Sequence, residues 1–191
     1  MQVLKDRIIK EGTAVGSDRI NVDGFINHKI DPLLLDQIGQ EFAERFKDIK
    51  VDKILTVEAS GIAIACAAAR YFDFCPVVFA KKAKPNTMTS DCYTADCMSF
   101  TKQQLNVLSV SVKHLCAGEK ILVIDDFLAH GEAGHAMADI VKQAGAELAG
   151  FGIVISKDFQ GGRAALENAG YRVEILAPVA SMDDGVIVWA E

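Results

Sequence analysis

Apolar residues recur every three or four positions in several parts of the chain, and this spacing predicts four helices. Asp31 and Pro32 supply a capping carboxylate and a first-turn proline to one of them. Gly12 and Gly145 are expected to end two others. The helices are predicted within residues 1–12, 32–49, 62–72 and 133–144.

Short apolar runs between these helices predict strands. A further alternation over residues 20–27 surrounds Asp23-Gly24, a dipeptide that favours a tight hairpin turn. Because strands alternate with helices, we expect an α/β fold with a mainly parallel central sheet flanked by helices. No repeat or linker divides the chain, so residues 1–191 are expected to form a single domain. The strands are predicted over residues 53–57, 76–80, 105–112, 120–124, 148–155 and 172–176.

Residues 81–104 interrupt this alternation with a polar stretch that is too long for an ordinary connection. The length predicts a flexible functional loop. Lys81, Lys82 and Lys84 begin it and could neutralise an anion locally, although charged residues in loops are as often simply solvated.

Composition excludes several classes of protein. The chain is 50% hydrophobic and contains ten Phe, so it has the residues of a folded core rather than of a disordered segment. No apolar run reaches the roughly 18 residues that a membrane span needs, and we expect a cytoplasmic protein. The net charge of -6 argues against a nucleic-acid surface, which requires a surplus of Lys and Arg. The five cysteines include no C-x-x-C pair and predict neither a disulfide framework nor a zinc site.

The most informative segment is 121–133, where a buried strand is followed by two acids, a turn of small residues and a helix. Ligands of open parallel sheets bind at the carboxyl ends of the strands, which is where Asp125 and Asp126 are expected. Adjacent carboxylates can accept hydrogen bonds from a diol or hold hydrated Mg²⁺, and the backbone N–H groups of the turn suit a phosphate. Together these features fit a ribose 5-phosphate. Taken alone, the acids could equally end a strand and cap the next helix.

This order of residues resembles the phosphoribosyl-pyrophosphate (PRPP) signature of type I phosphoribosyltransferases. Glu58-Ala59-Ser60-Gly61 is similar to the pyrophosphate-binding turn of that family, and the 81–104 segment stands in the usual place between the two motifs. Further blocks resemble the purine branch that acts on xanthine; they cover residues 27–32, 76–80, 99–103, 125–129 and 141–146.

The resemblance implies a type I phosphoribosyltransferase fold with a small hood, contributed by residues 13–30 and the C-terminal region. It implies a purine salvage enzyme that transfers the phosphoribosyl group from PRPP to N9 of xanthine, giving XMP and pyrophosphate. Mg²⁺ would act with PRPP and would be held mainly by PRPP and water, without a metal site made by the protein. The implied partners are the two substrates and a second copy of the chain in a homodimer, with no nucleic acid and no membrane.

The same resemblance implies roles for individual residues around PRPP. Asp125 and Asp126 are the candidate catalytic residues and would hold the ribose hydroxyls. The loop that would bind the 5-phosphate consists of Ala129, His130, Gly131, Glu132 and Ala133. The pyrophosphate region would comprise Glu58, Ala59, Ser60 and Lys81.

Three residues are implied to contact xanthine. Lys157 would donate to the 6-oxo oxygen, Asn27 would donate to the 2-oxo oxygen, and Ile20 would pack on the plane of the base. Without the resemblance, Lys157 could be a solvated lysine, and Asn27 and Ile20 could be ordinary hairpin and core residues.

Two residues depart from the pattern of the xanthine branch. His130 stands where the branch usually has Asn, and Glu132 stands where it usually has Gln. Because Glu132 would place an anion beside the phosphate, we expect its side chain to point away or the affinity for PRPP to be reduced.

Other functions remain open at this point. An adenine phosphoribosyltransferase would have a similar size and loop. A purine-sensing regulator on the same fold would need an additional DNA-binding domain, for which the sequence leaves no room. A phospho-acceptor signalling domain would need an Asp at the end of a later strand, and residues 172–178 contain none.

Overall fold

The computed structural model describes residues 1–82, 91–99, 104–183 and 185–190, and its centre is a six-stranded sheet with the strand order β10-β9-β8-β7-β3-β4. The pairs from β9 to β4 are all parallel, whereas β10 lies antiparallel to β9. The expectation of an α/β fold with a mainly parallel sheet is confirmed. The strands are β3 (Lys53–Val57), β4 (Val77–Ala80), β7 (Lys120–Leu128), β8 (Glu147–Lys157), β9 (Val173–Asp183) and β10 (Val186–Trp189).

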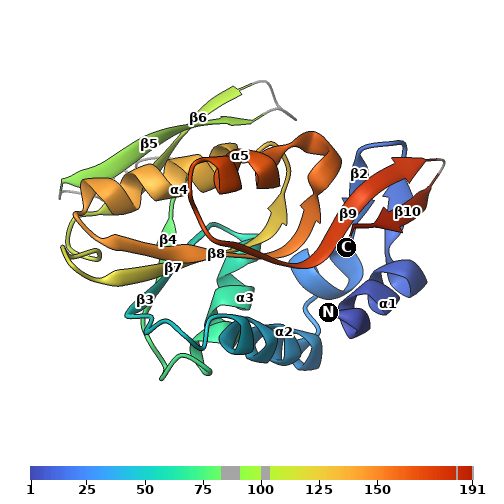
Figure 1. Cartoon of the computed structure of the whole chain (residues 1–191), viewed down its shortest axis with the longest axis horizontal. Coiled ribbons are helices and arrows are strands. Elements are labelled where there is room, and N and C mark those ends of the chain that lie inside the picture. Colours follow the sequence, from blue (N-terminus) through green and yellow to red (C-terminus); the bar gives the residue numbers. More distant parts are fainter. Residues whose placement is uncertain (83–90, 100–103, 184, 191) are drawn as a thin grey trace.

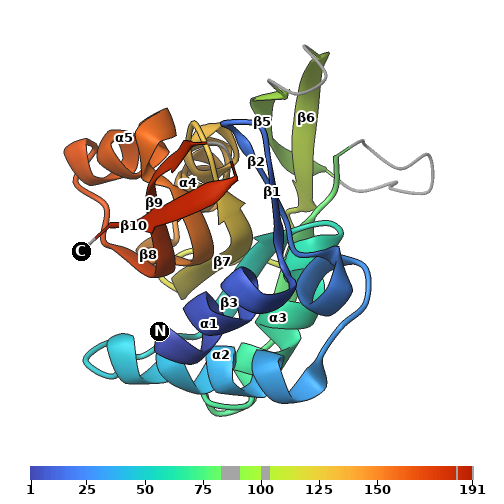
Figure 2. The same cartoon turned by 90° about the vertical axis from the view of Figure 1, so that its right-hand side faces the viewer.

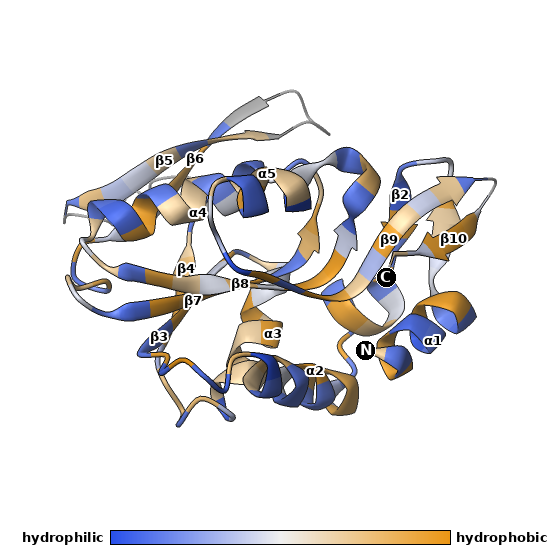
Figure 3. Cartoon of the chain, in the orientation of Figure 1, coloured by the Kyte–Doolittle hydropathy of each residue, from blue (hydrophilic) through white to orange (hydrophobic). Residues whose placement is uncertain are grey.

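Helices cover both faces of this sheet, with α2 and α3 on one side and α4 and α5 on the other (Figure 1). Helix α3 lies between α2 and the sheet, and it is hydrophobic along most of its length, whereas α2 and α4 also carry hydrophilic residues (Figure 3). The helices are α2 (Pro32–Arg45), α3 (Ser60–Ala69), α4 (Glu132–Gln143) and α5 (Gly162–Asn168).

The core consists of two clusters, one on each face of the sheet. Alternate residues of β7 enter opposite clusters: Leu122 and Ile124 pack on the α2 and α3 side, and Ile121 and Val123 pack on the α4 side. A strand that is buried on both faces is therefore a continuous apolar run, as the sequence shows.

The N-terminal segment forms α1 (Gln2–Glu11), β1 (Thr13–Val15), β2 (Arg19–Asn21) and the π-helical turn η1 (Asp23–Asn27). These elements lie at the end of the molecule that also holds β10 (Figures 1 and 2). The prediction of a hairpin with its turn at Asp23-Gly24 is wrong, because the turn lies at residues 16–18 and Asp23 begins η1. Phe25 and Ile26 are adjacent and both buried, which a helical turn allows and an alternating strand does not.

A second hairpin, β5 (Cys92–Ser99) and β6 (Gln104–Ser111), packs across α4 (Figure 1). The prediction of a flexible loop over 81–104 is therefore wrong for β5, which is a regular strand paired with β6 in antiparallel register. The rest of that loop prediction, at 83–90 and 100–103, lies outside the described residues.

Several boundaries differ from the predicted ones. Strand β7 was expected to end at Ile124 but continues through both acids to Leu128, and β9 extends to Asp183 instead of Leu176. Helix α5 and strand β10 were not predicted. No helix in the described parts of the chain is both long and apolar enough to cross a membrane.

Candidate functional site

The two acids of β7 lie side by side in a buried position near the carboxyl end of the strand. Asp125 Oδ1 accepts a hydrogen bond from the Asp126 backbone N–H at 3.0 Å. Burial raises the pKa of Asp125 well above its ordinary value, and the negative charge of Asp126 raises it further. These carboxylates are thus held close together at a cost in electrostatic energy, which is typical of a site that receives a ligand.

The turn over residues 129–133 leads from β7 into α4. Gly131 has a φ of 92° and lies directly before the first residue of α4, so the backbone reaches the helix through a left-handed conformation that suits glycine. Glu132, the first residue of the helix, is half-buried. The turn therefore presents a helix N-terminus, where backbone N–H groups favour an anion, next to the two acids.

A second turn packs directly against this one. The Gly162 N–H donates to the Ala129 carbonyl oxygen at 3.0 Å, and His130 Nδ1 lies 3.2 Å from the Gln160 carbonyl oxygen. A β carbon on Gly162 would lie 2.3 Å from the Ala129 oxygen, so the two backbones are in contact with no room for a side chain. The position of the 129–133 turn is thus fixed by the segment that follows β8.

The turn after β3 closes another side of the site. Glu58 Oε1 accepts a hydrogen bond from the Lys82 backbone N–H at 2.8 Å, and the Glu58–Ala59 peptide bond is cis. A β carbon on Gly61 would lie 3.2 Å from Asp125 Oδ1, so the start of α3 packs closely on the acid. The turn and the acid pair thus belong to one site.

Lys157 is the last residue of β8, as the sequence predicts. Its Nζ donates to the Asp18 carbonyl oxygen at 2.6 Å and lies 6.0 Å from the centre of the Phe127 ring. Burial lowers the pKa of the Lys157 ammonium, and the charge of Asp18 partly opposes that shift. The β1–β2 turn therefore meets the end of β8 at this lysine.

These elements enclose a pocket of about 400 Å³. Most of the predicted site residues line it: Glu58, Ser60, Asp125, Asp126, Ala129, His130, Gly131, Glu132, Ala133 and Lys157. The structure thus brings together, from three separate segments, most of the residues that were predicted to bind ribose, phosphate, pyrophosphate and base.

Four predicted residues do not line the pocket. Ile20 is buried in the hydrophobic core, and the exposed Asn27 donates from its Nδ2 to Asp126 Oδ2 at 3.4 Å. Ala59 is in the turn but outside the lining. The backbone of Lys81 pairs with Ser109 through two hydrogen bonds of 2.9 Å, and the exposed neighbour Lys82 lines the pocket instead.

Sequence reasoning missed the part of the lining that comes from the two hairpins. Asp18 and Arg19 come from the β1–β2 hairpin, and Cys97, Met98, Asn106 and Leu108 come from β5 and β6. No local motif marks these residues, because they reach the pocket only through long-range packing. In the described ranges, no group of three or more His, Cys, Asp or Glu side chains is placed to hold a metal ion.

Comparison with known proteins gives a consistent result. Residues 29–182 match the phosphoribosyl transferase domain family. The chain is 49% identical over 187 residues to a xanthine phosphoribosyltransferase of Clostridioides difficile (strain 630), covering 98% of each chain. It is 49% identical over 191 residues to a xanthine phosphoribosyltransferase of Pseudomonas entomophila (strain L48), covering 100% of each. A solved adenine phosphoribosyltransferase from Rhodothermus marinus superposes with a TM-score of 0.75 at 18% identity, over 94% of this chain and 100% of that one.

Proposed function

The chain belongs to the phosphoribosyltransferase family, and from its near-full-length similarity to xanthine phosphoribosyltransferases we propose that it transfers the phosphoribosyl group of PRPP to xanthine. A bond forms between N9 of the base and C1 of the ribose, the bond from C1 to the pyrophosphate oxygen breaks, and the base loses one ring proton. The products are XMP and pyrophosphate. The observation that carries this proposal is the pocket that joins the buried acid pair to the helix N-terminus at 129–133.

Within this pocket, Asp125 and Asp126 would accept hydrogen bonds from the ribose hydroxyls. Both carboxylates are buried and held by neighbouring groups, so their oxygens are already oriented before the ligand arrives. Backbone N–H groups at the start of α4 would bind the 5-phosphate. The C1 atom of PRPP would then be directed toward the turn at 58–60 on one side and toward Lys157 on the other.

The leaving pyrophosphate needs positive charge near it. Lys82 is exposed and lines the pocket, and Glu58 fixes its backbone, so of the two lysines described in this segment it is Lys82 that is placed to approach the pyrophosphate. We assign this part of the site to Glu58, Ala59, Ser60 and the neighbouring Lys81 and Lys82. Lys81 would contribute by fixing the strand register that directs Lys82 into the pocket.

Mg²⁺ fits the chemistry of this site. Asp125, Asp126 and Glu58 supply carboxylate oxygens of the kind that Mg²⁺ prefers, and PRPP and water would supply its other ligands. When bound, the ion would neutralise pyrophosphate oxygens as negative charge develops on them. The carboxylates of the chain would orient the ribose and limit the approach of water to C1.

The base would lie between Lys157 and Asn27. The half-buried Lys157 ammonium can donate to the 6-oxo oxygen while keeping its bond to the Asp18 carbonyl, because an ammonium has three N–H donors. Asn27 has a second amide N–H beyond the one that Asp126 accepts, and it would donate to the 2-oxo oxygen. Ile20 would support this arrangement from the core of the hood rather than from the pocket surface.

The test is to incubate the protein with Mg²⁺ and PRPP and with xanthine, guanine, hypoxanthine or adenine in turn, and to follow nucleotide formation. We expect XMP to form with the highest kcat/KM. Formation of AMP in preference to XMP would instead support an adenine phosphoribosyltransferase, and failure to consume PRPP with any base would refute the proposal.

The assembly and location of the enzyme also belong to the proposal. We expect a homodimer, because the hoods and loops of this family commonly lie at a subunit contact, and we expect it to act in the cytoplasm, where PRPP and free purines are available. Sedimentation at micromolar concentration tests the first expectation, and a monomer alone would contradict it.

A further inference from the structure

Gln143, a residue far from the pocket, is hydrogen-bonded to β5, a strand that lines the pocket. Gln143, the last residue of α4, forms two hydrogen bonds with the backbone of a single residue of β5. Its Nε2 donates to the Thr94 carbonyl oxygen at 2.8 Å, and its Oε1 accepts from the Thr94 N–H at 3.3 Å. The carboxamide thus binds the edge of β5 much as a residue of a neighbouring strand would.

The hairpin of β5 and β6 needs such a support. In the described part of the chain β5 pairs with β6 alone, and an isolated two-stranded ribbon is only marginally stable in water. It is also supported by packing against the α4 side of the core, through the buried Leu108 and Val110 of β6 and the partly buried Tyr93, Ala95 and Cys97 of β5, and by the bridge between Lys81 and Ser109. The Gln143 hydrogen bonds therefore fix a strand that has few other polar contacts.

The hairpin in turn forms a wall of the pocket. Cys97 and Met98 of β5 and Asn106 and Leu108 of β6 line it, opposite the start of α4. Gln143 itself is eleven residues beyond Glu132 on the same helix, which is about 16 Å along the helix axis. Gln143 therefore does not contact a ligand in the pocket, and its hydrogen bonds to Thr94 connect it to the wall formed by the hairpin.

We propose that Gln143 is a positioning residue for PRPP binding, because its carboxamide keeps β5 and β6 in place as a wall of the pocket. The inference rests on the proposed use of PRPP. When the hairpin is displaced for part of the time, the apparent affinity falls in proportion to the fraction of molecules that are competent to bind. Saturating PRPP restores the complete pocket, so kcat is preserved while KM rises.

The experiment compares Gln143→Ala with Lys142→Ala. Lys142 is the preceding residue on α4, is equally exposed, and has a helix propensity similar to that of Gln. We expect Gln143→Ala to raise the KM for PRPP about 3- to 10-fold, as the loss of two exposed hydrogen bonds implies, with kcat within about twofold of the wild type. Lys142→Ala should leave both constants unchanged.

Two further measurements separate positioning from general destabilisation. Amide hydrogen exchange at Thr94 should become faster in ligand-free Gln143→Ala and should return to the wild-type rate with saturating PRPP. Gln143→Glu keeps the acceptor for the Thr94 N–H, but its second carboxylate oxygen would face the Thr94 carbonyl oxygen and repel it, so the variant should raise KM at least as much as Gln143→Ala.

An unchanged KM for PRPP in Gln143→Ala would overturn the proposal, whether or not exchange at Thr94 became faster. An equal rise in KM in Lys142→Ala would also overturn it, because the effect would then belong to the helix and not to the carboxamide. A wild-type protein that consumes no PRPP would overturn the proposed function, and this result would precede any comparison of variants.

Discussion

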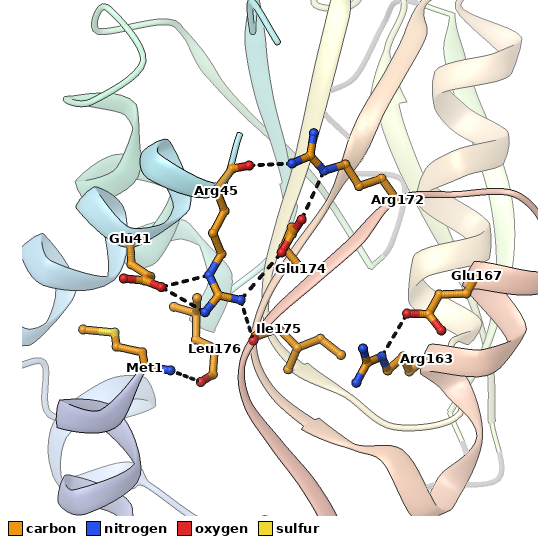
Figure 4. A network of polar contacts seen from close by, with 9 residues as sticks. All are labelled: Met1, Glu41, Arg45, Arg163, Glu167, Arg172, Glu174, Ile175 and Leu176. Atoms are coloured by element: carbon orange, nitrogen blue, oxygen red, sulfur yellow. Dashed lines mark hydrogen bonds and ion pairs between the residues drawn. The ribbon is translucent and has the colours of Figure 1, made fainter. Parts of the chain in front are cut away.

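The two ends of the parallel strands carry charged residues in opposite arrangements. At the carboxyl ends, Asp125 and Asp126 place two like charges together in a buried position. At the amino end of β9, Arg172 and Glu174 join Arg45 of α2 in a network of opposite charges (Figure 4). One end of the sheet thus contains charges that the protein itself does not neutralise, and the other contains charges that are already paired.

At the amino end of β9, each charged group of the network has partners within the protein. Arg172 Nη1 contacts both carboxylate oxygens of Asp48 at 2.9 and 2.8 Å, and its Nε donates to Glu174 at 3.2 Å. The guanidinium carbon lies 4.7 Å from the centre of the Phe46 ring. Arg45 Nη1 donates to the Ile175 carbonyl oxygen at 2.9 Å, and the same guanidinium pairs with Glu41 (Figure 4). These contacts connect α2 to β9 and pair both arginines with carboxylates of the protein itself.

The difference between the two ends indicates how to distinguish structural from functional charges. Paired charges at a surface contribute modestly to stability and need no ligand. Buried like charges lower stability until something binds them, so they persist where binding compensates for the cost. Four sets of variants test this contrast, beginning with the largest expected effect on catalysis and ending with none.

Asp125→Asn and Asp126→Asn should each lower kcat/KM for XMP formation by about 100-fold or more, because the oriented carboxylates that hold the ribose are lost. Steady-state kinetics with xanthine and PRPP measure this.

Asp125→Asn should at the same time stabilise the fold. A carboxyl group whose pKa is raised in the folded state binds its proton more tightly there, so stability falls as the pH rises from the ordinary carboxyl pKa through the raised one.

The Asn variant does not ionise, and its melting temperature should exceed that of the wild type at neutral pH. A gain of about 1 kcal/mol would correspond to about 2 to 4 °C in a chain of this size. This difference in melting temperature should disappear at acidic pH, where Asp125 of the wild type is protonated in both the folded and the unfolded state. A variant that kept near-normal activity would show that the acids do not hold the ribose.

Gly131→Val should raise the KM for PRPP about tenfold or more. The φ of 92° strains a β-branched residue, and its β carbon would lie 3.3 Å from the Gly162 backbone, so the turn must move. Gly170→Val is a matched control, because Gly170 has a φ of 87°, open space around its β carbon and no place in the pocket lining. Equal KM values in the two variants would move the phosphate site elsewhere.

Lys157→Ala and Asn27→Ala should change base selection by about 10- to 100-fold, since each leaves a buried acceptor of the base unpaired. Lys157→Ala should penalise xanthine, hypoxanthine and guanine similarly, because all three have the 6-oxo oxygen. Asn27→Ala should penalise xanthine far more than hypoxanthine, which has no substituent at C2. The measurement is kcat/KM for each base, and a uniform loss in Asn27→Ala would refute its role at the 2-oxo oxygen.

Arg172→Ala tests the other end of the sheet and should leave kcat/KM unchanged. It removes ion pairs with the partly exposed Asp48 and Glu174 and the packing of the guanidinium on the buried Phe46 ring, so unfolding should become easier by about 1 to 2 kcal/mol. Chemical denaturation measures the loss, and the same preparation provides the kinetic constants. A large fall in kcat/KM would show that this end of the sheet is coupled to the site and would weaken the contrast drawn above.

The order of strands and helices around the site could be predicted from the sequence, because each parallel strand is buried on both faces and each helix has a regular apolar face. The acid pair and the 129–133 turn were placed correctly because they follow directly from one such strand. Strand β9 was cut short at Leu176, since Pro178 cannot donate to a sheet and normally argues against a continuing strand. Helix α5 was missed because its seven residues span less than two turns.

The contribution of the hairpins could not be predicted in the same way. Whether Lys81 or Lys82 faces the pocket depends on the pairing of Lys81 with Ser109, a contact between residues 28 positions apart. Asn27 contacts Asp126 across 99 positions, and Lys157 contacts Asp18 across 139. Such contacts are set by tertiary packing, which a local pattern of residues does not encode.

The contact between Gly162 and the Ala129 carbonyl also fixes how two parts of the proposed site lie relative to each other. Lys157, at the proposed base site, and the 129–133 turn, at the proposed phosphate site, are joined through two backbones that touch without an intervening side chain. The separation between these two backbone segments therefore cannot be adjusted by a change of rotamer. Because a β carbon at Gly162 would lie 2.3 Å from the Ala129 oxygen, even Gly162→Ala should displace the two backbone segments from each other.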